Sequence, residues 1–231
     1  MLKASVYRQL QLYFVLAVAF GLPVIGSTEI FFGWRHPHTA TNRGHIFMVA
    51  YQLVGLLCLY LVLRLQKRSF RDIGVVLPMR ITEVAHSFAL LAGVFFFGLL
   101  TGFAIFAAYS FTGHPIRAFD DSMIFGNQIT LATVLFVLIN PFHEELIVRA
   151  FLITEMEQIY RSTGLAVFVS VFLQSYYHLY QGLPPALVHV SSFTLFSIYF
   201  VRTRRIMPVI MTHLFMDAMA LAVFARHLLH H

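Results

Sequence analysis

The stretch FALLAGVFFFGLLTGFAIFAAY, residues 88–109, contains no charged side chain and is apolar almost throughout. An α-helix needs about 20 mostly apolar residues to cross the hydrocarbon core of a membrane. The run is continuously apolar and does not alternate, which favours a spanning helix over a strand of a barrel. This stretch therefore predicts a membrane-spanning helix.

The rest of the chain has the same character. Of its 231 residues, 59% are hydrophobic and 11% are charged, whereas about a quarter of an ordinary soluble domain is charged. Long apolar runs recur from end to end and predict an all-α, polytopic transmembrane bundle of about seven spans. The predicted spans are Leu10–Ile25, Ile46–Leu63, Phe88–Tyr109, Ile129–Ile153, Leu165–Tyr180, Ala186–Val201 and Ile206–Phe224.

The basic residues predict the orientation. Net charge is +6, but the cations cluster between the apolar runs instead of forming one patch, which indicates membrane topology rather than a nucleic-acid partner. With the N-terminus inside, the positive-inside rule is satisfied. The inner side then holds Lys3, Arg8, Arg64, Lys67, Arg68, Arg71, Arg80, Arg161, Arg202, Arg204 and Arg205, and the outer side Arg35, Arg43, Arg117 and Arg226.

Ionisable side chains within the spans gather in the C-terminal half. Such groups cost at least about 2.5–3.5 kcal/mol each at mid-depth, so they normally face the bundle interior and serve a function. Spans two and three are nearly free of charge, which makes this concentration informative. The residues are His143, Glu144, Glu145 and Arg149 in the fourth span, His178 in the fifth, and His213 and Asp217 in the seventh.

Helical spacing suggests how these groups are arranged. Glu145 and Arg149 are four residues apart and share a face, so they can pair. Glu144 is rotated from Glu145 by about 100° and can point elsewhere, toward a reaction centre. His213 and Asp217 are also four apart and share a face of the last helix.

Together these residues form a set that can hydrolyse a peptide bond. Glu144 can act as general base on a water molecule. One histidine can orient that water, and the other, with Asp217 holding its tautomer, can stabilise an oxyanion or protonate the leaving amine. Glu144, His178 and His213 could instead ligate a divalent metal such as zinc, since two histidines and a carboxylate make an open site. The residues themselves leave both mechanisms open.

These motifs resemble those of a known family. Glu144-Glu145-Leu-Ile-Val-Arg149, an aromatic-rich helix ending in His178, and His213-Leu-Phe-Met-Asp217 are similar to the three motifs of the CAAX protease and bacteriocin-processing (CPBP, or Abi) family of intramembrane endopeptidases. The resemblance covers about residues 140–224. Within a single integral membrane domain of residues 1–231, it distinguishes N-terminal spans without motifs (1–125) from a catalytic core (126–225).

The resemblance implies roles for the motif residues. Glu144 would activate water, His178, His213 and Asp217 would complete the centre, and Glu145 with Arg149 would hold the helix. It implies an endopeptidase that cleaves a membrane-associated or prenylated peptide or protein. The chain departs from the family at Gln174, where the second motif usually has Phe.

Other classes of function fit less well. His143-Glu144 begins like the zinc motif HExxH, but Ile147 stands where the second histidine is required. A proton-coupled transporter is disfavoured because the polar residues lie in one half of the chain only. A non-catalytic immunity or scaffold protein of the same fold stays open. We expect a multi-pass protein of the cell (plasma) membrane, with lipid and a peptide or lipidated protein as its partners.

The depth of the motif residues adds one structural expectation. At about 1.5 Å per residue, His178 and His213 lie at different heights if both helices start at the inner surface. They can both approach Glu144 if the fourth helix continues past Ile153, or if the fifth helix is tilted or enters the membrane late; we predict the former. We therefore expect that helix to run on through Glu155–Tyr160.

Overall fold

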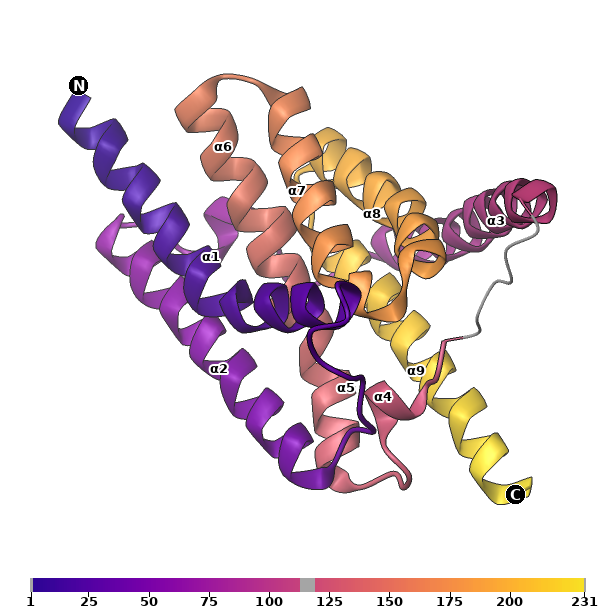
Figure 1. Cartoon of the computed structure of the whole chain (residues 1–231). Helices are drawn as coiled ribbons and strands as arrows, with labels where there is room; N and C mark the ends of the chain where they lie inside the picture. The colour runs from indigo at the N-terminus through magenta and orange to yellow at the C-terminus, as the bar shows by residue number, and fades with distance from the viewer. Residues whose placement is uncertain (1, 113–118, 231) are drawn as a thin grey trace.

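The computed structural model describes residues 2–112 and 119–230, and within these it is all-helical, with no strand (Figure 1). This confirms the predicted transmembrane helical bundle. The long elements are α1 (Leu2–Phe31), α2 (Asn42–Leu65), α3 (Ile81–Thr112), α5 (Leu131–Glu144), the π-helix η2 (Glu145–Phe151), α6 (Leu152–Tyr160), α7 (Thr163–Tyr177), α8 (Leu183–Thr203) and α9 (Met207–His230). Three short turns of helix connect them, η1 (Phe70–Ile73), α4 (Ser122–Phe125) and η3 (Leu179–Gln181).

Each predicted span coincides with a helix, and α1, α2, α3 and α8 extend beyond their predicted limits. The other three helices fall slightly short at one end, because α5 begins at Leu131, α7 ends at Tyr177 and α9 begins at Met207. Six helical segments are long and apolar enough to cross a membrane, and α7, with 15 residues, is a shorter apolar helix. The fourth segment runs without a break over Leu131–Tyr160 through α5, η2 and α6. The expected continuation past Ile153 is therefore confirmed.

The helices alternate in direction, so that most of the basic residues predicted to be inside lie at one end of the bundle. There, Arg8 of α1 and Arg68 after α2 both bind Glu155 of α6. At the same end Arg204, after α8, lies 2.6 Å from Glu157. The N-terminus and the C-terminus lie at opposite ends (Figure 1). Arg117, assigned to the outer side, lies outside the described residues.

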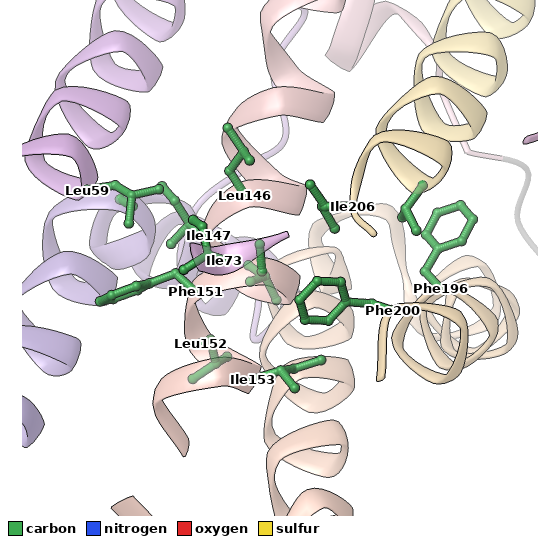
Figure 2. Close-up of a cluster of buried hydrophobic side chains, with 14 of the residues drawn as sticks. Leu59, Ile73, Leu146, Ile147, Phe151, Leu152, Ile153, Phe196, Phe200 and Ile206 are labelled. Atoms are coloured by element: carbon green, nitrogen blue, oxygen red, sulfur yellow. The ribbon is translucent and has the colours of Figure 1, made fainter. Parts of the chain in front are cut away.

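The segment α5–η2–α6 occupies the centre of the molecule. It contacts α1, α2, α7, α8 and α9, and all seven residues of η2 are buried. Ile147 and Phe151 of η2 pack into the main hydrophobic cluster with Leu59 of α2 and Phe200 of α8 (Figure 2). Polar side chains on this central segment are thus held inside the bundle, away from lipid.

Candidate active site

The π-helical turn brings both glutamates of the first motif to one place. Pro141 lacks a backbone N–H and so interrupts the hydrogen-bond ladder of α5 just before the turn. A π-turn widens the helix locally and is frequent at functional sites. Glu144 accepts a hydrogen bond of 2.7 Å from the amide of Gln174, whose same nitrogen lies 3.5 Å from Glu145. The two carboxylates therefore do not diverge as expected for a regular α-helix.

Glu145 forms the predicted pair with Arg149. The closest atoms, Arg149 Nε and a Glu145 oxygen, are 3.6 Å apart, and both side chains are fully buried. Arg149 also donates to the hydroxyl of Ser170 at 3.3 Å, and its guanidinium lies over the ring of Phe193 at 5.1 Å. A buried carboxylate needs a partner of this kind, because an uncompensated charge is strongly destabilising.

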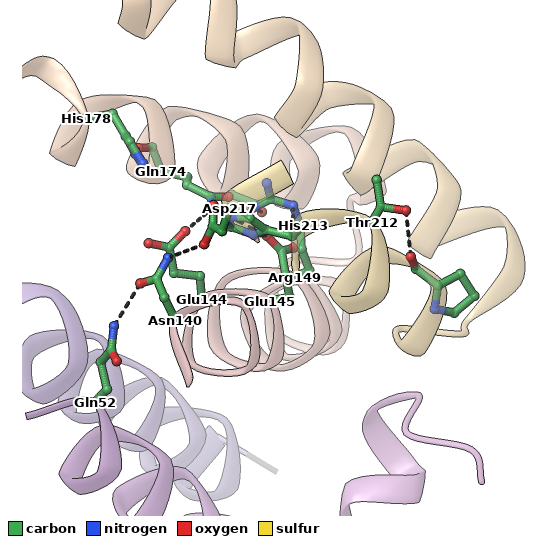
Figure 3. Close-up of polar contacts among 12 residues, drawn as sticks. Gln52, Asn140, Glu144, Glu145, Arg149, Gln174, His178, Thr212, His213 and Asp217 are labelled. Carbon is green, nitrogen blue, oxygen red and sulfur yellow. Dashed lines mark hydrogen bonds and ion pairs between the residues drawn. The ribbon is translucent and has the colours of Figure 1, made fainter. Parts of the chain in front are cut away.

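His213 connects this pair to the last helix. Its Nδ1 lies 2.9 Å from the second oxygen of Glu145, and its Nε2 lies 3.5 Å from Asp217, one turn further along α9 (Figure 3). Both ring nitrogens thus face carboxylate oxygens, an arrangement that suits a ring donating from both nitrogens. The Asp217 side chain is 27% exposed whereas that of Glu145 is wholly covered, so the site opens on the Asp217 side.

His178 caps the end of α7 and lies apart from this cluster. Its Nδ1 donates 2.7 Å to the backbone carbonyl of Gln174, since a carbonyl oxygen can only accept, and this leaves Nε2 as the nitrogen able to take a proton or a ligand. The ring packs against His189 and Phe193, with centroids 5.1 and 5.3 Å away. In Figure 3, Gln174 stands between His178 and Glu144.

Four polar residues of the site were not singled out as functional from the sequence. Gln174 was noted only as a departure from the family, yet its side chain donates directly to Glu144. Ser170 accepts from Arg149 and donates to the carbonyl of Val148. Asn140 contacts Asp217, and Gln52 of α2 contacts Asn140. Two of them could have been found from spacing, because Asn140 precedes Glu144, and Gln174 precedes His178, by one helical turn.

The site has a donor set that could hold a metal ion. Glu144, Glu145 and His213 each offer one ligand atom, and these atoms lie within 4.8 Å of one another. Two of these three residues, Glu144 and His213, were predicted as ligands. The third is Glu145, whereas His178 was expected from the sequence. Carboxylates and an imidazole are suitable ligands for zinc, so the residues fit a divalent ion.

Comparison with known proteins was made on the whole chain. Residues 126–219 match the model of a family described as Rce1-like, type II CAAX prenyl endopeptidase. No curated protein and no solved structure matched the chain. The matched residues include all the motif residues from Glu144 to Asp217. The resemblance to the CPBP/CAAX protease family is therefore confirmed, and together with the apolar helices it supports an integral membrane protein.

Proposed function

We propose, on the premise that residues 126–219 are related to CAAX prenyl endopeptidases, that this chain hydrolyses a peptide bond within the membrane. Its substrate is a membrane-associated or prenylated peptide or protein. The observation that carries the proposal is the meeting of Glu144, Glu145 and His213 from two different helices in one buried cluster. Buried ionisable groups that converge in a membrane bundle are expensive to maintain and normally serve a function.

Glu144 is the general base. The residue is 6% exposed, and Gln174 donates to its Oε2, so we assign the water to Oε1. The water oxygen forms a bond to the substrate carbonyl carbon as its proton passes to Glu144. When the carbon–nitrogen bond breaks, that proton goes on to the leaving amine. Glu145 stays paired with Arg149 and holds His213 in place.

His213 and His178 act on the other atoms of the reaction. Glu145 holds His213 through Nδ1. The Nε2 of His213, whose contact with Asp217 is the longer one at 3.5 Å, is the nitrogen that donates to the oxyanion formed on the attacked carbonyl. His178 has its Nδ1 engaged with a backbone carbonyl, so that its Nε2 is the nitrogen available to orient water. Asp217 fixes the ring of His213, as a carboxylate does for the histidine of a hydrolytic site.

A metal-assisted form of the same reaction uses the same residues. A divalent ion such as zinc would be held by Glu144, Glu145 and His213, with His178 as a further candidate ligand. Such an ion supplies Lewis acidity and an activated water. Of these candidate ligands, Glu145 also pairs with Arg149.

The proposal is tested by comparing wild type with Glu144→Gln in detergent or liposomes, using a fluorescent prenylated CAAX peptide. We expect Glu144→Gln to lose about 100-fold or more in kcat, since a general base typically contributes roughly 10²- to 10⁴-fold. Glu155→Gln is the matched control, because Glu155 is an equally buried glutamate of the same helical segment that binds Arg8 and Arg68 instead. Undiminished cleavage by Glu144→Gln would refute the assignment. Wild-type activity that a chelator abolishes and zinc restores would establish the metal-assisted form.

A non-catalytic immunity or scaffold protein of the same fold is the second candidate. One observation favours it, because the amide of Gln174 occupies one oxygen of Glu144 and contacts Glu145 as well. A protein of this kind would leave the peptide intact in the wild type. We assign the chain to the cell membrane, where lipid and the peptide substrate are its partners.

A further inference from the structure

A chain of hydrogen-bonded amides runs from α2 to the candidate active site. Gln52 is 2% exposed, and its Nε2 donates 2.8 Å to the Oδ1 of Asn140 in α5. The Nδ2 of Asn140 in turn donates 3.4 Å to Asp217 (Figure 3). Because Asp217 lies 3.5 Å from the Nε2 of His213, the amide chain ends at a ring assigned to catalysis.

The chain can run in only one direction. An amide has a donor end and an acceptor end, whereas an ionised carboxylate only accepts. Asn140 must therefore turn its nitrogen to Asp217, which leaves its oxygen facing α2. Only the nitrogen of Gln52 can pair with that oxygen. The other end of the Gln52 amide, Oε1, is buried and has no hydrogen-bond partner among residues 2–112 and 119–230, so the contact with Asn140 is the one that fixes this side chain.

We propose that Gln52 is a positioning residue for the active site. It fixes the orientation of the Asn140 amide, which holds Asp217, and Asp217 in turn orients His213. The proposal rests on the proposed function. Gln52 lies in α2, outside the residues that match the endopeptidase family, so this support comes from a helix that carries no motif.

A matched control distinguishes a positioning role of Gln52 from a purely structural one. Gln11 of α1 is another buried glutamine, 7% exposed, whose Oε1 accepts 2.9 Å from the amide of Gln66. Its Nε2 has no hydrogen-bond partner, so each glutamine makes one amide contact and leaves one atom unsatisfied. Gln11 and Gln66 adjoin Arg68 and Glu155, at the end of the bundle away from Asp217.

The first experiment compares Gln52→Leu with Gln11→Leu in cleavage of the prenylated CAAX peptide. Both variants lose one buried hydrogen bond, so we expect similar decreases in Tm. Gln52→Leu should also lose roughly 10- to 100-fold in kcat with little change in KM, the usual effect of removing a residue that orients an active-site group. Gln11→Leu should keep its kcat. Equal kcat values for the two variants would overturn the proposal.

A reversal experiment tests the direction of the amide chain. Gln52→Glu places an acceptor opposite Asn140, which must then turn its nitrogen to α2. The Asn140 oxygen then faces the Asp217 carboxylate, and neither oxygen can donate a hydrogen bond. Adding Asp217→Asn supplies a donor for that oxygen and leaves an acceptor for His213. We expect the double variant to be at least about tenfold more active than either single variant, since coupled residues are not additive. Additive losses would contradict the proposal.

A third measurement does not depend on the substrate. In chains labelled with ¹⁵N-histidine, the ring signals of His213 are identified by their absence in His213→Gln. At one fixed pH, Gln52→Leu should shift these signals relative to wild type, and Gln11→Leu should not. If wild type fails to cleave the peptide but the signals shift, the proposed substrate is wrong and the positioning role stands. Unshifted signals in Gln52→Leu would refute the positioning role itself.

Discussion

Gln174 places a hydrogen-bond donor on the carboxylate that we assign to water activation. The same residue offers its backbone carbonyl to His178, so one turn of α7 holds two candidate catalytic groups. The two contacts differ in what a substitution would change. Any residue at 174 keeps the carbonyl, but only a side-chain donor keeps the contact to Glu144. The side chain can therefore be changed without displacing His178.

We predict that Gln174→Phe raises kcat by roughly tenfold, a modest part of what a general base contributes. The change frees Glu144 Oε2 for water and installs the residue usual in the family that this chain resembles. Initial rates on the prenylated peptide test this, with Ser175→Ala, a neighbouring residue of α7 whose hydroxyl makes no hydrogen bond, as control. A fall in kcat would show that the donor from Gln174 is needed for the reaction.

Arg149 is a fully buried cation whose role is to neutralise Glu145. We predict that Arg149→Met lowers the free energy of unfolding by about 3–5 kcal/mol, because it leaves a buried carboxylate without its partner. The double variant Glu145→Gln with Arg149→Met should be more stable than Arg149→Met alone. Unfolding in detergent measures both. A single variant as stable as wild type would mean that Glu145 is neutralised by His213 instead.

At the scale of the element, the π-helix η2 begins at Glu145, where Glu144 and Glu145 both approach the side chain of Gln174. Sequence patterns predicted the helix that contains Glu144 and its continuation to Tyr160, because the positions and lengths of apolar runs can be read directly from the sequence. They did not predict the wider turn at Glu145–Phe151, since this turn packs against α1, α7 and α8, which are distant in the sequence. The expected divergence of Glu144 from Glu145 assumed regular α-helical geometry and was wrong for that reason.

The pairs one helical turn apart were more predictable than the contacts between helices. Glu145 with Arg149, and His213 with Asp217, were expected from spacing alone and are present. The contacts of Gln174 with Glu144 and of Gln52 with Asn140 join different helices, and spacing within one helix says nothing about them. Resemblance to a family did not help either, because Gln174 departs from its pattern and Gln52 lies outside it.

The π-turn can be tested through Pro141. Pro141→Ala restores a backbone N–H to α5 and should favour a regular α-helix, turning Glu144 away from His213. We predict a loss of about tenfold or more in kcat with stability unchanged or increased, since proline inside a helix is itself unfavourable. Pro23→Ala is the control, because Pro23 lies within α1 and should leave kcat unchanged. Full activity in Pro141→Ala would show that the π-turn does not depend on this proline.

At the scale of the whole molecule, ion pairs join the helices at the end that we assign to the inner side. Glu155 binds Arg8 and Arg68, Glu157 binds Arg204, and Glu83 of α3 binds Arg205. Acidic residues count little in the positive-inside rule, which depends on Lys and Arg near the ends of the spans. The orientation predicted from the basic residues is therefore unaffected by these pairs, and it stays a prediction about which side faces the cytoplasm.

The orientation can be measured with single cysteines, because Cys58 is the only natural one. On a Cys58→Ser background, Arg71→Cys lies in η1, between α2 and α3, and Gln128→Cys lies between α4 and α5; both positions are exposed. A membrane-impermeant maleimide added to intact cells should label Gln128→Cys alone, and in inverted vesicles it should label Arg71→Cys alone. This result follows if the N-terminus is inside and α1, α2 and α3 each cross the membrane once. Labelling of Arg71→Cys from outside would show that the predicted orientation is reversed. Asp217, the exposed edge of the site, would then have its distances from the cytoplasmic and outer surfaces of the membrane exchanged.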